Sequence, residues 1–293
     1  MNNLHIVTVA TESQYYFPYL LDSCERNGKK LQVLGMGEEW QGFNWRFTKM
    51  INYLKTLPQN DIVCFVDGYD VVCCRNLKEL PNVFLEIKKR TGCKIVVGHE
   101  KLSFLNGLLA YTYFGRCNNS YINAGTYIGT VNDLLEILPK IYALNPKDDA
   151  DDQVLITKYC KQNSSEIYCD TKNQLFLTLV YSLREIDKFI EIDANNNNNI
   201  IYDNNNPFFI HAAGNGYLDN VINKLGYSTE PNKIKNQLFY NFYKKVLLYC
   251  VEIFKTYIIV IFLILIIIVF FNYSKIRKKI SLFTKSTKAF KKK

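Results

Sequence analysis

Short runs of β-branched and aromatic residues alternate with longer segments of helical periodicity along this chain, and this alternation constrains its fold more than any other feature. Turn residues bound these runs, as expected for the buried strands of an α/β domain. Strands that alternate with helices form a mainly parallel sheet with helices on both faces, and ligands bind beyond the carboxyl ends of its strands. The predicted strands are Leu4–Ala10, Leu31–Leu34, Ile62–Val66, Lys94–Val97 and Phe208–His211, and the predicted helices are Tyr16–Arg26, Arg46–Leu57, Leu77–Arg90 and Leu134–Leu144.

The positive charge of the chain is concentrated at one end. The 293 residues include 36 Lys and Arg against 27 Asp and Glu, a formal net charge of +9. Nine of the basic residues and no acidic residue fall within positions 272–293, so the rest of the chain is formally neutral. A neutral body argues against nucleic acid as a partner, because nucleic-acid binding needs basic residues on the folded surface.

An apolar segment near the C-terminus has the length of a membrane span. Residues 257–271 carry no charge, and with 256, 272 and 273 the segment reaches 18 residues, about 27 Å as a helix. We expect a folded domain over 1–232, an amphipathic helical linker over 233–255, a transmembrane helix over 256–273 and a basic tail over 274–293 that contacts membrane lipids. The protein is therefore expected to be a single-pass membrane protein with a C-terminal anchor.

The sequence leaves the side of the membrane open. A basic tail favours the cytoplasmic side for the C-terminus, which would place the folded domain across the membrane. The N-terminal residues lack the basic segment and apolar run of a signal peptide, and insertion of the tail after synthesis would leave the domain in the cytosol. Nine cysteines without a CxxC pair argue against a zinc module, and most are expected to be reduced thiols.

A pair of carboxylates follows the third predicted strand. Asp67 and Asp70 are separated by Gly68 and Tyr69, and the apolar run Ile62–Val66 leads directly into them. Two carboxylates on one turn can face a single Mn²⁺ or Mg²⁺ ion, which takes oxygen ligands and completes its shell with substrate phosphates. A glycine lets the backbone approach a ligand closely. The alternative is a surface turn with two solvated acids.

Three further features follow predicted strands or precede an apolar helix. Asn123 is a polar residue within the apolar run Tyr121–Gly125, where it needs a partner. The segment Asp148–Gln153 holds four acids in five positions, which is more than helix capping requires, although capping remains the alternative. His211 ends a predicted strand before the glycine-rich turn 214–216, and it is either a ligand or a histidine of the core.

With these segments in order, the sequence resembles the glycosyltransferase domain of procollagen lysyl hydroxylases and, more distantly, the procollagen galactosyltransferases. LGMGEEWQG and FVDGYDVV are the most specific matches. The resemblance runs along residues 4–226 and omits a hydroxylase domain. The matching segments are Ile6–Thr11, Leu34–Gly42, Phe65–Val72, Glu100, Tyr121–Gly129, Asp148–Gln153 and His211 with its glycine turn.

The resemblance implies a GT-A-like (Rossmann-like) fold, a UDP-glucose or UDP-galactose donor and Mn²⁺, with Mg²⁺ as the alternative metal. It implies transfer of glucose or galactose to a hydroxyl acceptor such as hydroxylysine or galactosyl-hydroxylysine of a collagen-like chain. Carried over residue by residue, it assigns the metal to Asp67, Asp70 and His211, the nucleotide-sugar site to Thr8, Thr11, Trp40, Lys49, Tyr69, Glu100, Gly214 and Asn215, and the catalytic site to Asn123, Asp151 and Asp152.

Three departures from the family pattern leave the acceptor and the phosphate contacts open. Ala150 interrupts the acidic run, Phe104 stands where the family tends to have a tryptophan, and the turn after His211 is longer. The alternative to an enzyme is a non-catalytic membrane protein with a decayed transferase fold that binds a nucleotide sugar or serves a structural role. A phosphotransferase is less well supported, because the chain has no GxxxxGK[ST] phosphate loop.

Overall fold

The computed structural model divides the chain into two compact units, Met1–Gln237 and Leu238–Lys293. It describes residues 2–102, 104–178, 190–193, 199–202, 204–214 and 216–228 continuously. Beyond these it describes residues 234, 236–237, 240, 243, 247, 257–268, 270, 272–273 and 277.

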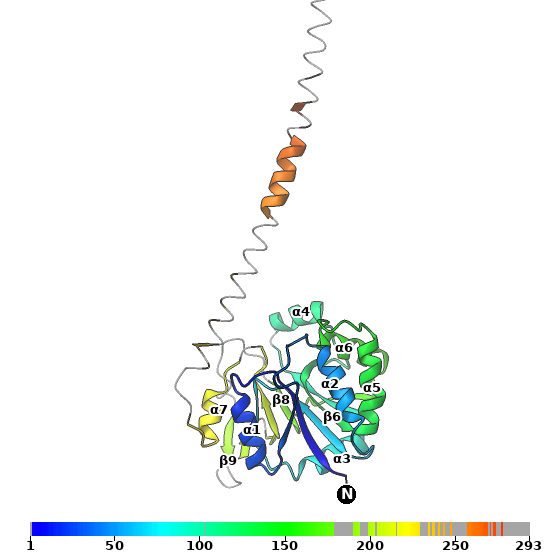
Figure 1. The fold of residues 1–293 in the computed structure, drawn as a ribbon, viewed down its shortest axis with the longest axis vertical. Coiled ribbons are helices and arrows are strands. Elements are labelled where there is room, and N and C mark those ends of the chain that lie inside the picture. The colour runs from blue at the N-terminus through cyan, green and yellow to red at the C-terminus, as the bar shows by residue number, and fades with distance from the viewer. Residues whose placement is uncertain are drawn as a thin grey trace, which may run out of the picture. The chain divides into compact units, whose positions relative to one another are not determined.

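The first unit is built on one large sheet with helices on both faces (Figure 1). Among the described residues this sheet has nine strands: eight follow the order β2-β1-β3-β6-β5-β8-β11-β4, and β7 pairs with β5. A separate two-stranded sheet pairs β9 with β10. The strands are β1 (Leu4–Val9), β2 (Leu31–Leu34), β3 (Ile62–Val66), β4 (Val71–Cys73), β5 (Ile95–Glu100), β6 (Tyr121–Thr130), β7 (Ile167–Cys169), β8 (Phe176–Thr178), β9 (Glu191–Asp193), β10 (Asn199–Ile201) and β11 (Phe209–His211).

The sheet is mainly parallel, as expected, but two of its described strands, β6 and β4, run in the opposite direction to the others. The strand pairs β1–β2, β1–β3, β5–β7, β5–β8 and β8–β11 are parallel, but β6 runs antiparallel to both β3 and β5. The chain leaves β5 at its carboxyl end and forms α4 there, so β6 enters the sheet from that end and must run in the opposite direction (Figure 1). The edge strand β4 is likewise antiparallel to β11.

This topology brings several chain segments together at one end of the sheet. β3, β5 and β11 run in the same direction, so their carboxyl ends meet there. The first residues of β6 lie at the same end of the sheet, because β6 is antiparallel to β3 and β5. The residues that end or follow these strands are Asp67, Glu100 and His211, and Asn123 lies at the start of β6.

Two apolar clusters fix the helices to the faces of the sheet. Successive side chains of a strand point to opposite faces, so Val63 and Phe65 of β3 pack into one cluster while Cys64 and Val66 pack into the other. The first cluster also holds residues of α2, α5 and α6, and the second holds residues of α1 and α3. The helices are α1 (Phe17–Arg26), α2 (Trp45–Leu54), α3 (Leu80–Thr91), α4 (Phe104–Tyr113), α5 (Val131–Ala143), α6 (Asp152–Gln162) and α7 (Asp219–Lys224).

Local sequence signals set the helix boundaries. Pro81 lies in the first turn of α3, where its missing N–H costs nothing, so the helix begins at Leu80 rather than at the predicted Leu77. Gly92 ends the same helix with a left-handed φ of 72°. Thr130 caps α5 by accepting a hydrogen bond from the Asp133 N–H.

The described cysteines are mostly reduced, as expected. Cys117 and Cys160 form a disulfide, with 5.8 Å between their Cα atoms. The other described cysteines are free and buried, and burial raises the pKa of the Cys64 and Cys74 thiols well above their ordinary value. Cys250 lies outside the described residues.

The described residues of the second unit are helical. Within the described part of the chain, no helix has both the length and the apolar character needed to cross a membrane, so the predicted transmembrane helix over 256–273 is not confirmed. Residues 256, 269 and 271 of that segment lie outside the described residues, as do most of the predicted linker 233–255 and tail 274–293.

Candidate functional site

The turn that joins β3 to β4 carries Asp67 and Asp70. The backbone N–H of Asp67 donates to the Gly125 carbonyl at 2.8 Å, which fixes the start of the turn against β6. Gly68 lies close over β1: a Cβ atom at this position would be 3.1 Å from Thr8 Oγ1 and 3.2 Å from the Ala10 Cβ. The turn is therefore pressed against the sheet, and its two carboxylates remain only partly buried.

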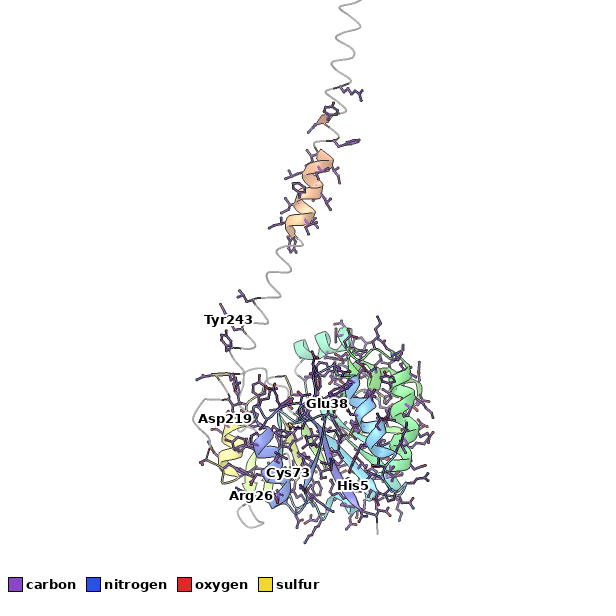
Figure 2. The ribbon with its side chains drawn as sticks, viewed as in Figure 1. His5, Arg26, Glu38, Cys73, Asp219 and Tyr243 are labelled. Carbon is purple, nitrogen blue, oxygen red and sulfur yellow. A yellow bond between two sulfur atoms is a disulfide. The ribbon has the colours of Figure 1, made fainter. Side chains whose placement is uncertain are left out.

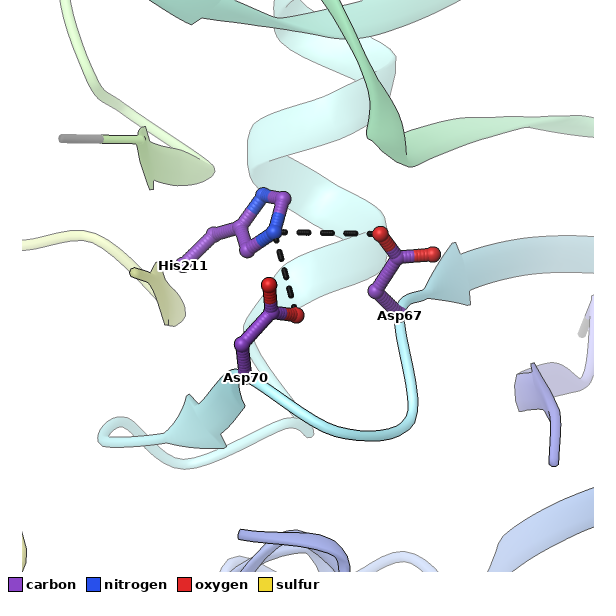
Figure 3. A group of neighbouring side chains, drawn as sticks. All are labelled: Asp67, Asp70 and His211. Carbon is purple, nitrogen blue, oxygen red and sulfur yellow. Dashed lines mark ion pairs between the residues drawn. The ribbon is translucent and has the colours of Figure 1, made fainter. Parts of the chain in front are cut away.

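His211 completes a cluster with these two carboxylates (Figure 3). β11 pairs with β4 so that His211 lies opposite Val71, and the Ala212 N–H donates to the Asp70 carbonyl at 2.8 Å. His211 Nε2 lies 3.1 Å from Asp70 Oδ1 and 3.8 Å from Asp67 Oδ2. One ligand atom from each of the three residues lies within 4.8 Å of the others.

The donor set fits a divalent cation. His211 Nδ1 lies 3.0 Å from Asn123 Oδ1, and as a donor it leaves the Nε2 lone pair free to bind a metal. Nε2 is buried and makes no hydrogen bond of normal geometry, although two carboxylates face it. Two carboxylates and an imidazole suit Mn²⁺ or Mg²⁺ with further oxygen ligands from a substrate.

Gly125 leaves the space that this cluster needs. A Cβ atom at position 125 would overlap the His211 ring and the Asp67 carboxylate. Burial lowers the pKa of His211, but the Asp70 and Asp67 carboxylates outweigh this and raise it above its ordinary value. A cation at the cluster would replace the proton that these carboxylates favour on the imidazole.

The cluster forms part of the wall of a cavity of about 390 Å³, which we call the acidic cavity. Asp151 caps α6, because its Oδ1 accepts a hydrogen bond from the Val154 N–H at 3.0 Å. The capping alternative for this acid is thus confirmed, and its side chain also lines the cavity. The acidic cavity is lined by Phe43, Arg46, Asp67, Asp70, Glu100, Phe114, Asn123, Ala124, Gly125, Asp151, Asp152, Gln153, His211, Ala213 and Gly214.

Arg46 forms ion pairs with both Asp67 and Asp152. Its guanidinium donates to Asp67 Oδ1 through Nη1 and to Asp152 Oδ2 through Nη2. Burial raises the pKa of Asp152 to about 6, and the nearby Arg46 opposes this shift. Asp152 therefore needs its arginine partner to remain ionised in a buried position.

A chain of amide contacts connects the Asp67–Asp70–His211 cluster to Glu100. Asn123 Nδ2 donates to Glu100 Oε1 at 2.9 Å, and Gln153 Nε2 donates to the same oxygen at 3.2 Å. Burial raises the pKa of Glu100, and these two hydrogen bonds act against the shift. Because Asn123 Oδ1 also contacts His211, the orientation of the imidazole is linked through one amide to a buried carboxyl group.

A second cavity of about 340 Å³ shares a wall with the first, and we call it the aromatic cavity. Tyr69 is anchored there because its hydroxyl accepts a hydrogen bond from the Thr11 N–H at 3.0 Å. Trp40 also lines this cavity, with 39% of its surface exposed. The aromatic cavity is lined by Val9, Thr11, Glu12, Gln14, Trp40, Phe43, Arg46, Asp67, Gly68, Tyr69 and Asp70.

The structure brings most of the predicted site residues together. The metal and catalytic candidates, with Glu100 and Gly214, line the acidic cavity, and Thr11, Trp40 and Tyr69 line the aromatic cavity. Thr8 and Lys49 are not among the residues that line either cavity: Thr8 is fully buried and Lys49 pairs with Glu38. Asn215 lies outside the described residues. Figure 2 shows Glu38 toward the end of the sheet where α4 lies, and His5 toward the opposite end.

The sequence interpretation missed Arg46, Phe43 and Gln153. Arg46 was predicted only as the first residue of a helix, and a charged residue at that place is normally solvated. Gln153 ends the acidic motif but was not assigned a role. An arginine between aromatic residues, twenty-one positions before the acidic turn, is the signal that was available.

The sheet is mixed, and an acidic turn follows a buried strand at its end. These features are those of the GT-A-like fold of glycosyltransferases. Within this class the family described as PLOD GT domain matches residues 1–238, and the chain belongs to that family.

Curated relatives share about a quarter of their residues with the chain. It is 26% identical over 239 residues to the procollagen-lysine,2-oxoglutarate 5-dioxygenase of Drosophila melanogaster, a match that covers 74% of this chain and 31% of that protein. It is 27% identical over 241 residues to the human multifunctional procollagen lysine hydroxylase and glycosyltransferase LH3, covering 76% of this chain and 31% of the relative. The match thus spans about a third of the length of these relatives.

Solved structures are more distant in sequence. A glycosyltransferase involved in glycosylation of the major capsid of PBCV-1 is 15% identical with a TM-score of 0.41, covering 59% of this chain and 84% of that one. The galactosyltransferase LgtC, solved with donor and acceptor sugar analogues, is 13% identical with a TM-score of 0.43, covering 79% of this chain and 99% of that one.

Proposed function

We propose that this protein is a metal-dependent glycosyltransferase that moves glucose or galactose from a UDP-sugar to a hydroxyl group of an acceptor. The observation that carries the proposal is the cluster of Asp67, Asp70 and His211 in the acidic cavity, whose two aspartates also line the aromatic cavity. Membership of the PLOD GT domain family supports the same reaction class. Relatives named as procollagen lysine hydroxylase and glycosyltransferase favour hydroxylysine or galactosyl-hydroxylysine of a collagen-like chain as the acceptor.

In this proposal the metal is Mn²⁺ and is held by Asp67, Asp70 and His211. When bound, the cation would offset the negative charge of the diphosphate as UDP departs. The ring of Tyr69 would stack on the uracil, because its anchored hydroxyl holds the ring in the wall of the aromatic cavity. The nucleotide would thus occupy the aromatic cavity, and the sugar and acceptor would occupy the acidic cavity.

The chain's own residues position the acceptor. Asp151 and Asp152 line the acidic cavity, where a carboxylate can orient the acceptor hydroxyl or accept its proton. Asp152 is held by Arg46 and Asp151 by the first turn of α6, so neither carboxylate needs to be ordered by the substrate. Asn123 presents its amide to the same cavity while it orients His211.

The test is a donor screen with the full chain. UDP-glucose and UDP-galactose are offered with Mn²⁺ and a hydroxylysine peptide or a galactosyl-hydroxylysine peptide, and release of UDP and the glycosylated product are measured. We expect turnover with one donor, and loss of turnover both in EDTA and in Asp70→Asn. Asp22→Asn is the matched control, because this half-exposed aspartate pairs with Arg26 on the surface of α1 and lines neither cavity. Activity that survives EDTA and Asp70→Asn overturns the metal assignment.

The alternative of a non-catalytic binding protein has its own outcome. Calorimetry of UDP with and without Mn²⁺ measures whether the cluster and the aromatic cavity bind a nucleotide. Mn²⁺-dependent UDP binding without turnover of any donor would favour that alternative. Absence of both binding and turnover would contradict the proposed function.

A further inference from the structure

Arg46 lies at the junction of the two cavities and is the only lysine or arginine among the described residues that line them. The acidic cavity carries five carboxyl groups, those of Asp67, Asp70, Glu100, Asp151 and Asp152. Carboxylates that lie close together destabilise one another unless a cation lies between them. Arg46 supplies a permanent cation at the point where the two cavities meet.

The guanidinium of Arg46 uses each of its nitrogen atoms for a different partner. Nη1 donates to Asp67 and Nη2 donates to Asp152, while Nε donates to the Phe43 carbonyl at 3.4 Å. Only 8% of the Arg46 side chain is exposed. Because the guanidinium is planar and rigid, these three contacts fix the two carboxylates relative to each other.

The two oxygens of Asp67 have different neighbours. Oδ1 accepts from Arg46, whereas Oδ2 lies 3.8 Å from His211 Nε2. The arginine therefore occupies the oxygen that faces Asp152 and leaves the other oxygen directed to the metal cluster. A freely rotating carboxylate would present either oxygen to the cation.

The backbone around Arg46 is built onto the segment before α6. The N–H groups of Asn44 and Trp45 both donate to the Asp148 carbonyl, at 2.9 Å and 3.2 Å. Asn44 Nδ2 donates to the carbonyls of Asn145 at 2.8 Å and Lys147 at 3.0 Å. The start of α2 and the approach to α6 are thus joined by four hydrogen bonds, independently of the ion pairs.

We infer that Arg46 is a positioning residue that couples the metal cluster to the acceptor side of the site. It directs Asp67 Oδ2 toward the cation and at the same time holds Asp152 against the wall of the acidic cavity. This inference rests on the proposed function for its effect on turnover, but its effect on metal binding does not depend on any particular donor or acceptor.

The first experiment compares Arg46→Lys with Arg75→Lys in the full chain. Lysine keeps the charge but has one compact ammonium group, which cannot hold two carboxylates in a fixed plane. We expect Arg46→Lys to lower kcat about 100-fold, as small misplacements of reacting groups do. We expect the Kd for Mn²⁺ alone, measured by electron paramagnetic resonance, to rise about tenfold, as when an outer contact of a metal ligand is lost.

Arg75 is the matched control because it also pairs with a carboxylate, Glu79, and donates to the Asn206 carbonyl, but lines neither cavity. Arg75→Lys is expected to leave kcat and the Kd for Mn²⁺ unchanged. If Arg46→Lys keeps wild-type kcat and Kd, a positive charge alone suffices and the inference is wrong. If both arginine variants lower the Tm equally and lose activity only in proportion to unfolded protein, Arg46 is structural and the inference is also wrong.

A double-mutant cycle isolates the contact with Asp152. The kcat values of Arg46→Lys, Asp152→Asn and the double variant are compared. We expect the kcat of the double variant to equal that of the single variant with the lower kcat, because both residues act through one pair. Fully multiplicative losses overturn the coupling. If the wild-type chain turns over no donor, the proposed function fails, and the Kd for Mn²⁺ in Arg46→Lys still decides the inference. Absence of Mn²⁺ binding by the wild-type chain overturns both.

Discussion

The side chains of His211 and Asn123 contact each other at the end of the sheet, with His211 Nδ1 3.0 Å from Asn123 Oδ1. The two residues are 88 positions apart in the chain and come from β11 and β6. The contact sets which nitrogen of the imidazole carries the proton in its neutral form. It therefore leaves Nε2 directed toward Asp67 and Asp70.

Asn123→Ala is expected to weaken Mn²⁺ binding by about 10- to 100-fold, because the imidazole loses the contact that orients it. Calorimetric titration of the variant with Mn²⁺ measures the change. Asn132→Ala is the control, since this residue is exposed in the first turn of α5 and lines neither cavity. Wild-type affinity in Asn123→Ala would show that the amide does not orient His211.

The affinity for Mn²⁺ is expected to fall as the pH is lowered. Asp70 and Asp67 raise the pKa of His211 above its ordinary value of 6.5, against the effect of burial. Below that raised pKa, the imidazole must lose a proton before it can bind the metal, which costs about tenfold in affinity per pH unit. Mn²⁺ titrations at several pH values between about 5.5 and about 8 measure the slope, because this range extends roughly one unit to either side of the range in which histidine titrates.

His211→Gln is expected to bind Mn²⁺ more weakly at high pH and to lose most of this slope. His5→Gln is the control, because His5 lies toward the opposite end of the sheet and pairs with Asp61 (Figure 2). An unchanged slope in His211→Gln would show that another group takes up the proton.

Gly125→Ala is expected to abolish Mn²⁺ binding and to lower the free energy of unfolding by about 1–3 kcal/mol, because the added methyl group would overlap His211 and Asp67. Urea denaturation and metal titration measure the two effects. Gly92→Ala separates steric overlap from backbone strain: its φ is 72°, and nothing lies within 4 Å of the added Cβ. That control should lose about 1 kcal/mol of stability and keep full metal binding.

Asp152 is expected to make the metal-free protein less stable as the pH rises from about 4 to about 6. Burial raises its pKa to about 6 from 3.8, so in this range the folded state keeps a proton that the unfolded state has lost. The resulting loss is about 3 kcal/mol, and it persists above the folded pKa.

Asp152→Asn lacks this titration, so its stability relative to the wild type should improve by about 2–3 kcal/mol between about pH 4, close to the unfolded pKa, and about pH 7, roughly one unit above the folded pKa. Urea denaturation at the two pH values measures it. A constant stability difference between Asp152→Asn and the wild type would contradict the raised pKa.

Local patterns identified the strands that carry the metal candidates. The apolar run Ile62–Val66 matches β3 residue for residue, because five consecutive buried positions bounded by turn residues have few alternatives. Leu31–Leu34 is equally well predicted. The direction of β6 was not predictable in this way, since periodicity does not show where a strand enters a sheet.

The same limit applies to the site. Asp67 and Asp70 lie on one turn, so their proximity follows from the sequence alone. The role of Arg46 does not, because its two partners lie 21 and 106 residues away and only the packing of α2 against the segment before α6 brings them together.

By itself, the sequence determined the strand that delivers the paired carboxylates and the family to which the chain belongs. Only the tertiary structure decided which oxygen of Asp67 faces the metal cluster, which nitrogen of His211 is free and which cation holds Asp152. The physical reason is that residue type and local periodicity fix short-range structure, whereas hydrogen bonds between distant segments depend on the register and direction of every strand between them.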